Sequence, residues 1–512
     1  MSPRRPHHQP ALRLSAGLAL LLFLPLPTTQ AEETDSGSGQ QVRHRLAILA
    51  DMGNEADEEQ QIAHMLMNSN EFDLEALIAV TGIFLRPESR IPYRQKLHPE
   101  LFQELIDAYE KVLPNLRLHA SGWPEPAYLR SIVTTGQTGY GIDDVGPGKA
   151  SPGSLRLMEL LQKEDPRPLW LVVNAGSNTL AQALLDLEAE LESEPVRFAE
   201  LLGRLRIYEN GAQDNAGAWL CARYPDLHWI RSNFQTYSFG GPKADIGPHF
   251  WQPYDYSPDG QDDWLKEHVR TGHGALGDRY PQRLLNERVW FMEGGGTIPW
   301  LGLVNKGLFD INEPSWGGWG GRFTREKIKN VWSRHPKIKR DERQSAPFFA
   351  HSDAADTWLN PLSGETITGE FVPVWRWRPA MYANLQCRMD WCVQPYEEAN
   401  HHPVAALGSD RSDTILRQAA QPGSTLHFDA SLSQDPDGDS LEFSWWHYRE
   451  AGTYPQPLLL VDPASASLSL EIPQDAAGTQ IHLILEVRDQ NPIASLSDYR
   501  RLVIDVPAEP ID

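Results

Sequence analysis

The sequence predicts a mainly parallel α/β fold with helices on both faces of its sheet, followed by a small all-β, immunoglobulin-like sandwich. The first observation is that apolar strand-like segments alternate with amphipathic helical segments from residue 43 to about 310. This alternation is typical of parallel strands covered by helices. The second observation is that short alternating segments separated by Pro, Gly and Asp begin near residue 406, which indicates a sandwich. A chain of 512 residues is also too long for one hydrophobic core.

The α/β part begins with one strand–helix–strand unit. HRLAILAD reads as a buried strand that ends at a turn, and EEQQIAHMLMNSN has helical spacing at Ile62, Met65 and Leu66. FDLEALIAVTG is a second apolar strand. Strand, loop, helix and strand in this order are the elements of a parallel unit.

The same pattern then repeats. Helices are expected over residues 97–116, 151–164 and 178–193, and strands over 167–176, 201–211 and 226–233. Ligands on such sheets bind at the loops that follow the carboxyl ends of the strands. Asp51, Asn174 and Gly211 each follow a predicted strand, so we expect three polar loops on one rim of the sheet.

Residues 311–405 are irregular and rich in Trp, and we expect them to form extended loops and helices that complete the first domain, residues 43–405. The second domain is expected over residues 406–508, where STLHFDAS, SLEFSWWHY, ASLSLEIP, TQIHLILEVRD and RRLVIDV read as strands. Between them, Asp435, Asp437 and Asp439 alternate in QDPDGDS, with Asp429 upstream. The turn resembles calcium-stabilised turns but lacks the terminal Glu of an EF-hand, and a solvated Asp/Gly turn is the alternative.

The N-terminus predicts export. Arg4, Arg5 and Arg13 precede an apolar run that is followed by TTQAEE, which is the pattern of a secretory signal peptide over residues 1–31, with cleavage expected after Ala31. We therefore expect a periplasmic or extracellular protein with no membrane span after cleavage.

Charge and cysteine usage narrow the function. The net charge is −23 with scattered Lys and Arg, which argues against nucleic acid as a partner. Three cysteines, Cys221, Cys387 and Cys392, do not make a disulfide framework. Cys387 and Cys392 are close enough in sequence to pair if the turn permits, and free buried thiols are the alternative.

The segment with the clearest chemistry is ADMGNEADEE, residues 50–59, between a strand and a helix. Clustered carboxylates repel one another unless protons or a hard cation intervene, and Ca²⁺ takes oxygen ligands from such loops. The alternative is an ordinary acidic helix N-terminus. That alternative is favoured for Glu58 and Glu59 alone, whereas Asp51 ends a buried strand and favours a functional role.

These residues resemble a known family. Nucleoside hydrolases carry an Asp-rich loop after their first strand that holds a catalytic Ca²⁺, and this chain is more similar still to the nucleoside-hydrolase-like proteins described as cellulose-binding. The resemblance extends in order through VVNAGSNTLAQAL, AQDNAGAWL, TGHGALGDRYP, PSWGGWGGRF, VWRWRPAMY and FDASLSQDPDGDSLEFSWWHY. It implies a nucleoside-hydrolase-like α/β domain with a C-terminal β domain.

The resemblance also implies roles for individual residues. Asp51, Asp57 and Glu58 fall where the hydrolases bind metal, so a possible, weakened Ca²⁺ site is expected there. Three positions depart from the pattern: Leu49 replaces the first Asp, Glu58 replaces the second member of the carboxylate pair, and Gly296 stands where the related pattern has an Asp. The site has therefore lost charge.

If the site is active, a metal-bound water positioned by Asp51 attacks an anomeric carbon, and His273 is a candidate acid for the leaving group. For His273 a loop histidine that caps the backbone is the alternative. Asn178 falls near the place where a backbone carbonyl adds a ligand in the hydrolases. The candidates for substrate binding in the polar loops are Asn54, Asn178, Gln213, Asp214 and Asn215.

The second candidate surface is aromatic, because flat aromatic faces stack on sugar rings. Trp316 and Trp319 lie in a Gly-rich loop with Arg322 and are candidates for ligand contact. For Trp375 and Trp377 a buried aromatic core is favoured. The leading hypothesis is an exported hydrolase of glycosidic bonds that acts on a nucleoside or a carbohydrate. The alternatives are a non-catalytic carbohydrate-binding protein, with cellulose as the expected ligand, and an envelope protein with only a structural role.

Overall fold

The computed structural model describes residues 43–240, 264–281, 283–285, 289–291, 294–304, 307–329, 345–360 and 364–508. The signal peptide expected over residues 1–31 lies outside these residues. Within the part of the chain that is described, no helix combines the length and the apolar character needed to cross a membrane.

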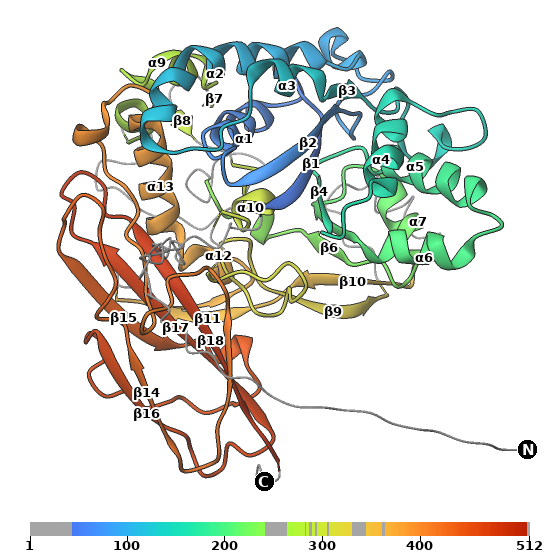
Figure 1. The fold of residues 1–512 in the computed structure, drawn as a ribbon. Helices are drawn as coiled ribbons and strands as arrows, with labels where there is room; N and C mark the ends of the chain where they lie inside the picture. Colours follow the sequence, from blue (N-terminus) through green and yellow to red (C-terminus); the bar gives the residue numbers. More distant parts are fainter. Residues whose placement is uncertain are drawn as a thin grey trace, which may run out of the picture. The chain divides into compact units, whose positions relative to one another are not determined.

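The α/β part is built on an eight-stranded sheet in the order β3-β2-β1-β4-β5-β6-β10-β9 (Figure 1). Neighbouring strands pair in parallel except β9 and β10, which pair antiparallel. The bounds are β1 His44–Ala50, β2 Phe72–Ala79, β3 Val133–Thr135, β4 Leu169–Val173, β5 Leu205–Asn210, β6 Trp229–Ser232, β9 Phe323–Ile328 and β10 Phe348–Asp353. The predicted mainly parallel sheet is confirmed.

One part of the prediction is wrong. Residues 311–405 were expected to form only loops and helices, yet they supply β9 and β10 to the main sheet. Only Phe323 and Ile328 of β9 are buried, and the four residues between them are exposed. This edge strand therefore lacks the continuous apolar run by which the central strands are detected in a sequence.

Helices cover both faces of the sheet because β1 alternates its side chains between two cores. Leu46 and Ile48 belong to a core shared with α1 and α2, whereas Ala47 and Leu49 belong to a core shared with α4, α5 and α7. Figure 1 shows the two sets of helices flanking the strands. The helices up to residue 223 are α1 Ala56–Leu66, α2 Pro99–His119, α3 Pro126–Ser131, α4 Pro152–Gln162, α5 Ser177–Glu190, α6 Pro195–Gly203 and α7 Ala216–Arg223.

Further short elements follow before residue 400. They are α9 Gly274–Arg279, β7 Arg283–Leu285, β8 Val289–Phe291, α10 Thr297–Leu301, β11 Asp356–Leu359, β12 Thr366–Gly369, α12 Val372–Trp375 and α13 Arg378–Asp390. Trp375 and Trp377 are buried in this region, in agreement with the core interpretation of these residues.

The C-terminal strands form a four-stranded sheet in the order β13-β18-β17-β15 and a two-stranded sheet of β14 and β16. All pairs are antiparallel except β13 and β18. The bounds are β13 Leu416–Ala419, β14 Thr425–Asp429, β15 Leu441–His447, β16 Ser467–Glu471, β17 Thr479–Asp489 and β18 Ser497–Val506. These sheets enclose a core of their own, so the predicted all-β part is confirmed.

The C-terminal strands also contribute to the first core. Tyr448, Ile484 and Tyr499 are members of the core that contains α1 and α2. Buried Arg501 donates from Nε to the carbonyl of Leu308 over 2.8 Å. The C-terminal sheet is therefore packed against the α/β part through both apolar and polar contacts.

The acidic turn of the C-terminal part uses its carboxylates internally. Asp435 Oδ1 accepts hydrogen bonds from the backbone N–H groups of Asp437 and Asp439, at 2.9 and 3.0 Å. Asp437 in turn accepts from the backbone N–H of His401 at 2.7 Å, and Asp439 accepts from Asn491 at 2.9 Å. These contacts are those of a structural turn. The open question of the cysteines is resolved in favour of free, buried thiols at all three positions.

Candidate functional site

Polar residues gather where the central strands end. Asp51 directly follows β1 and Asn174 follows β4, and these two strands are hydrogen-bonded neighbours. These two residues and three others are buried, and we call the five together the rim cluster: Asp51, Asn54, Asp57, Glu58 and Asn174. The expectation that the loops after β1 and β4 share one edge of the sheet agrees with this arrangement.

The loop after β1 brings its carboxylates together by turning tightly. The backbone N–H of Asn54 donates to the carbonyl of Asp51 over 3.0 Å, and Gly53 has a φ of +86°, a conformation that residues with a Cβ adopt at a cost. A Cβ at position 53 would also lie 2.8 Å from Cδ2 of His98. Helix α1 begins at Ala56, which places Asp57 and Glu58 in its first turn.

Glu58 is the centre of the rim cluster. Its Oε2 accepts hydrogen bonds from Asn174 Nδ2 and from Gln61 Nε2, each over 3.2 Å. Burial, followed by the charges of Asp51 and Asp57, raises the pKa of Glu58 well above its ordinary value. Burial also raises the pKa of Asp51 to about 7. Buried carboxyl groups whose charges act on one another do not all ionise readily at neutral pH.

Glycines border the cluster, and one of them marks the position of a missing acid. A Cβ on Gly296 would lie 2.5 Å from Nδ2 of Asn174, and a Cβ on Gly295 would lie 2.6 Å from Oδ2 of Asp57. Position 296, where the resemblance expects an Asp, thus adjoins the cluster, but Asn174 occupies the space that such a side chain would need.

The resemblance predicts a calcium site at Asp51, Asp57 and Glu58. In the described part of the chain, no three His, Cys, Asp or Glu side chains form a group able to hold a metal ion. Ca²⁺ takes six to eight oxygen ligands, whereas Glu58 already accepts from two amides. The described residues therefore do not fit a complete calcium site. Oxygens that are buried and lack a hydrogen-bond partner within the described residues are Asp51 Oδ2, Asn54 Oδ1 and Asn174 Oδ1.

A second polar loop follows β5, and it mostly holds the backbone. Asp214 accepts from the backbone N–H groups of Asn178 and Ala216, at 3.1 and 2.9 Å, and burial raises its pKa to about 6. Asn215 Oδ1 accepts from the N–H of Ile142 at 2.9 Å. These oxygens join the starts of α5 and α7 to neighbouring loops, and substrate binding by Asp214 and Asn215 stays a prediction.

Two of the predicted substrate-binding residues in this region keep a buried acceptor. The side-chain oxygens of Asn178 and Gln213 have no hydrogen-bond partner among the residues with described positions. The Nδ2 group of Asn178 donates to the carbonyl of Gly139 over 2.9 Å, which fixes the orientation of the amide.

Four other candidates make contacts within the protein. Trp319 is 1% exposed and packs near Tyr499, and Trp316 is 5% exposed and packs on His482. Neither ring face can meet a ligand, because the C-terminal strands cover both. Arg322 Nε is paired with buried Asp356 over 2.7 Å.

His273 is the fourth of these. It precedes α9, and its Nε2 pairs with Asp390 at the end of α13 over 3.1 Å. Asp390 belongs to α13 and is not a member of the rim cluster, and the catalytic role of His273 stays a prediction.

Two buried acids near the rim were missed by the sequence analysis. Glu209, on β5, pairs with Arg231 over 2.6 Å with both side chains almost fully buried. Asp353, at the end of β10, accepts from the backbone N–H groups of residues 233–235, and burial raises its pKa to about 6. The ending FFAHSD carries the same signal as Asp51, an acid at the end of an apolar segment, but the segment was not interpreted as a strand.

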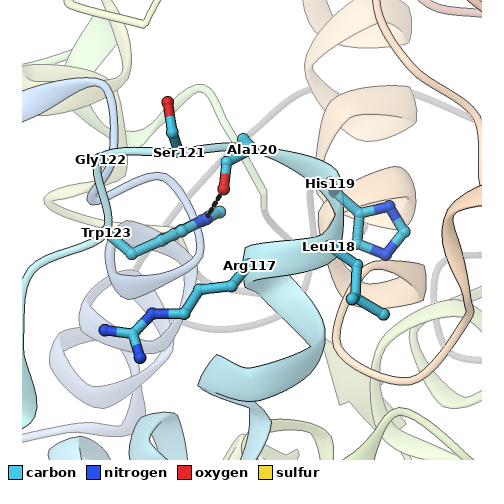
Figure 2. A pocket seen from close by; sticks show the side chains of 7 residues that line it. All are labelled: Arg117, Leu118, His119, Ala120, Ser121, Gly122 and Trp123. Atoms are coloured by element: carbon cyan, nitrogen blue, oxygen red, sulfur yellow. Dashed lines mark hydrogen bonds between the residues drawn. The ribbon is translucent and has the colours of Figure 1, made fainter.

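A surface hollow of about 590 Å³ lies elsewhere, at the end of α2, and is lined by residues 117–123 (Figure 2). Trp123 Nε1 donates to the carbonyl of Ala120 over 2.8 Å, and the side chains of Arg117 and His119 point in opposite directions. Arg117 is paired with Glu125, and His119 stacks on Trp391. The polar groups of this hollow do not converge on a common point, so the rim cluster is the better candidate site.

Comparisons with known proteins agree with this picture. Residues 45–323 match the family model described as the nucleoside hydrolase-like domain of cellulose-binding Sde182, and residues 425–506 match the C-terminal domain of cellulose-binding protein Sde0182. A solved structure from Saccharophagus degradans, described as a nucleoside hydrolase-related protein associated with carbohydrate metabolism, is 34% identical with a TM-score of 0.74. The similarity covers 91% of this chain and 100% of that one. No curated protein matches the chain.

Proposed function

The chain belongs to the family of cellulose-binding, nucleoside hydrolase-like proteins, and from this membership we propose that it is an exported, non-catalytic carbohydrate-binding protein. The observation that carries the proposal is the state of the rim cluster. Glu58 is buried beside Asp51 with its Oε2 already bonded to the amides of Asn174 and Gln61, and Asn174 fills the space beside Gly296 where the resemblance expects an acid.

This arrangement is poorly suited both to metal-dependent hydrolysis and to metal-free hydrolysis by two carboxyl groups. A metal-dependent reaction needs an open set of ligands and a metal-bound water, and no such set is found in the described residues. Metal-free glycosidases separate their two carboxyl groups by about 5 to 10 Å so that substrate or water fits between them. Asp51 and Glu58 are both buried, and Oε2 of Glu58 is occupied by the amides of Asn174 and Gln61.

The cluster is suited to binding hydroxyl groups. Buried oxygens without partners cost free energy unless a donor reaches them, and Asp51, Asn54 and Asn174 each have one. A sugar presents several O–H donors on a rigid ring, so it can satisfy more than one of these acceptors at once. The description of the family as cellulose-binding supports a carbohydrate as this ligand.

The proposal is tested by calorimetric titration of the mature protein with soluble cello-oligosaccharides and with ribose. We expect saturable binding that Asn174→Ala weakens by about tenfold, the equivalent of one hydrogen bond of about 1.4 kcal/mol. Asn68→Ala is the matched control, because Asn68 also has a buried amide with an unpartnered oxygen but lies beyond the far end of α1. Equal affinity of the wild-type protein and Asn174→Ala would refute the role of the cluster.

A second candidate function is metal-dependent cleavage of a glycosidic bond, and the unpartnered Oδ2 of Asp51 is the observation in its favour. Asp51 would hold and orient the attacking water in that case, and a bound cation would supply Lewis acidity. Release of base or reducing sugar in the presence of Ca²⁺, abolished by Asp51→Asn, would establish this function in place of the first.

Export is part of the proposal. The predicted signal peptide over residues 1–31 supports it, as does a family described by binding to an extracellular polymer. N-terminal sequencing of the protein recovered from the periplasm or medium is expected to begin at Glu32.

A further inference from the structure

A groove of about 820 Å³ lies between the C-terminal sheet and the segments around β11 and α13. We call it the junction groove and define it by Trp358, Arg376, Ser444, Trp446, Leu459 and Arg488, which are among the residues that line it. Its volume is within the range of about 300 to 1,000 Å³ that ligand sites occupy. It shares no lining residue with the rim cluster.

The floor of the groove is one face of the antiparallel sheet. Ser444 on β15 lies opposite Glu486 on β17, and Trp446 lies two residues further along the same face. Trp446 is half-buried and is held by Arg376, whose guanidinium lies 5.3 Å from the ring centroid, and by Trp377, whose ring centroid is 5.4 Å away. The indole is thus fixed in position before any ligand binds.

The walls of the groove are partly apolar and exposed. Trp358 is half-buried on β11, and its neighbour Leu359 is 62% exposed. The opposite wall is the loop of residues 457–463, where Leu459 is 88% exposed. Exposed apolar side chains that surround a recess are typical of a binding surface, whereas single exposed apolar residues are ordinary on a soluble protein.

The charged side chains of the groove are already engaged within the protein. Arg376 pairs with Asp356 over 3.1 Å, and Arg488 pairs with Glu442 over 2.6 Å. Glu486 accepts hydrogen bonds from Ser497 and Tyr499, and Glu450 lies 3.7 Å from Arg449. The groove therefore presents hydrogen-bonding edges without an uncompensated charge, which suits a neutral ligand and disfavours an acidic or basic one.

We propose that the junction groove binds a neutral polysaccharide chain, with Trp446 and Trp358 contacting the apolar faces of successive sugar rings. This inference rests on the proposed carbohydrate-binding function and assigns it a second surface, distinct from the rim cluster. The stacking of a sugar ring on an indole combines apolar contact with hydroxyl groups that reach the polar edges around it.

The test is retention of the mature full-length protein on insoluble cellulose, with soluble cellohexaose as the competitor. Trp358→Ala removes one ring face, and Ser444→Arg fills the groove without removing any packed side chain. We expect each to weaken retention by at least about tenfold. Trp219→Ala is the matched control, because Trp219 is also half-buried but lies on α7 beside Arg223, and it should retain wild-type binding.

Other outcomes overturn the inference in distinguishable ways. Wild-type retention by both groove variants would remove the groove from polymer binding, as would failure of the wild-type protein to be retained at all. In either case the calorimetric comparison with Asn174→Ala still decides the proposed function separately. Equal retention on phenyl-agarose, without competition by cellohexaose, would identify an apolar peptide-binding surface instead.

Discussion

Replacing Gly296 with Asp restores the acid of the related pattern, and we expect it to destabilise the protein rather than create a metal site. Gly296 has a φ of +82°, and a Cβ there would lie 2.5 Å from Asn174 Nδ2. The new side chain must therefore adopt a left-handed backbone conformation and also displace the amide that donates to Glu58.

The two costs can be separated with a matched glycine. Gly272 has a φ of +83°, but no atom would lie within 4 Å of a Cβ there. Gly272→Asp should therefore cost only the conformational penalty, about 1 to 2 kcal/mol. Gly296→Asp should cost about 2 to 4 kcal/mol more, from overpacking and from loss of the hydrogen bond between Asn174 and Glu58.

The assay is the free energy of unfolding in urea, followed by tryptophan fluorescence, for both variants and for Gly296→Asp combined with Asn174→Ala. The double variant should regain the overpacking part of the loss, because the smaller residue vacates the space. If Gly296→Asp is no less stable than Gly272→Asp, then Asn174 does not fill the position of the missing acid and the argument against a metal site loses its main support.

Three further predictions concern the rest of the molecule. Asp356→Asn should lower the free energy of unfolding by about 3 to 5 kcal/mol, because Asp356 is a buried partner of two arginines and a tyrosine. The control in the same urea assay is Asp505→Asn, which removes a half-exposed ion pair and should cost less than about 1 kcal/mol. Burial lowers the pKa of His64 to about 3, so the stability that depends on its neutral form is fully present above pH 6.5 and is lost as pH falls toward 3. His64→Leu should therefore reduce the slope of the unfolding free energy against pH in that window by up to about 1.4 kcal/mol per pH unit. An unchanged slope would contradict the lowered pKa of His64. Burial raises the pKa of Cys387 and Cys392, so a thiol reagent at pH 8 should label these residues only after the protein is unfolded. Rapid labelling of the native protein would show that these thiols are accessible.

The fold could be predicted where one local pattern dictates the structure. β1 and β4 are buried on both faces and read as continuous apolar runs, and α4 has a capping box at Ser151 and Ser154 with a proline at its start, so its beginning was visible in the sequence. In β9, at the sheet edge, the four residues between Phe323 and Ile328 are all exposed, so the sequence contains no apolar run that indicates this strand.

The candidate site could be predicted only in part, for a similar reason. Asp51 and Asn174 were found because each ends an apolar strand, and their convergence follows from the parallel sheet. The burial of Trp316 and Trp319 could not be predicted, because a Gly-rich loop is equally able to present a ring to solvent or to a second sheet. The strands that bury these rings begin more than a hundred residues later, and a local pattern contains no information about that distance.

The contribution of the C-terminal strands to the first core has a consequence for protein engineering. Because Tyr448, Ile484 and Tyr499 complete that core, and Arg501 satisfies a carbonyl on the α/β side, the C-terminal part is not an interchangeable module. A chain that ended before residue 406 would expose the apolar surface that these side chains now cover, and it should aggregate. Transplanting either half to another protein would require redesign of the shared surface.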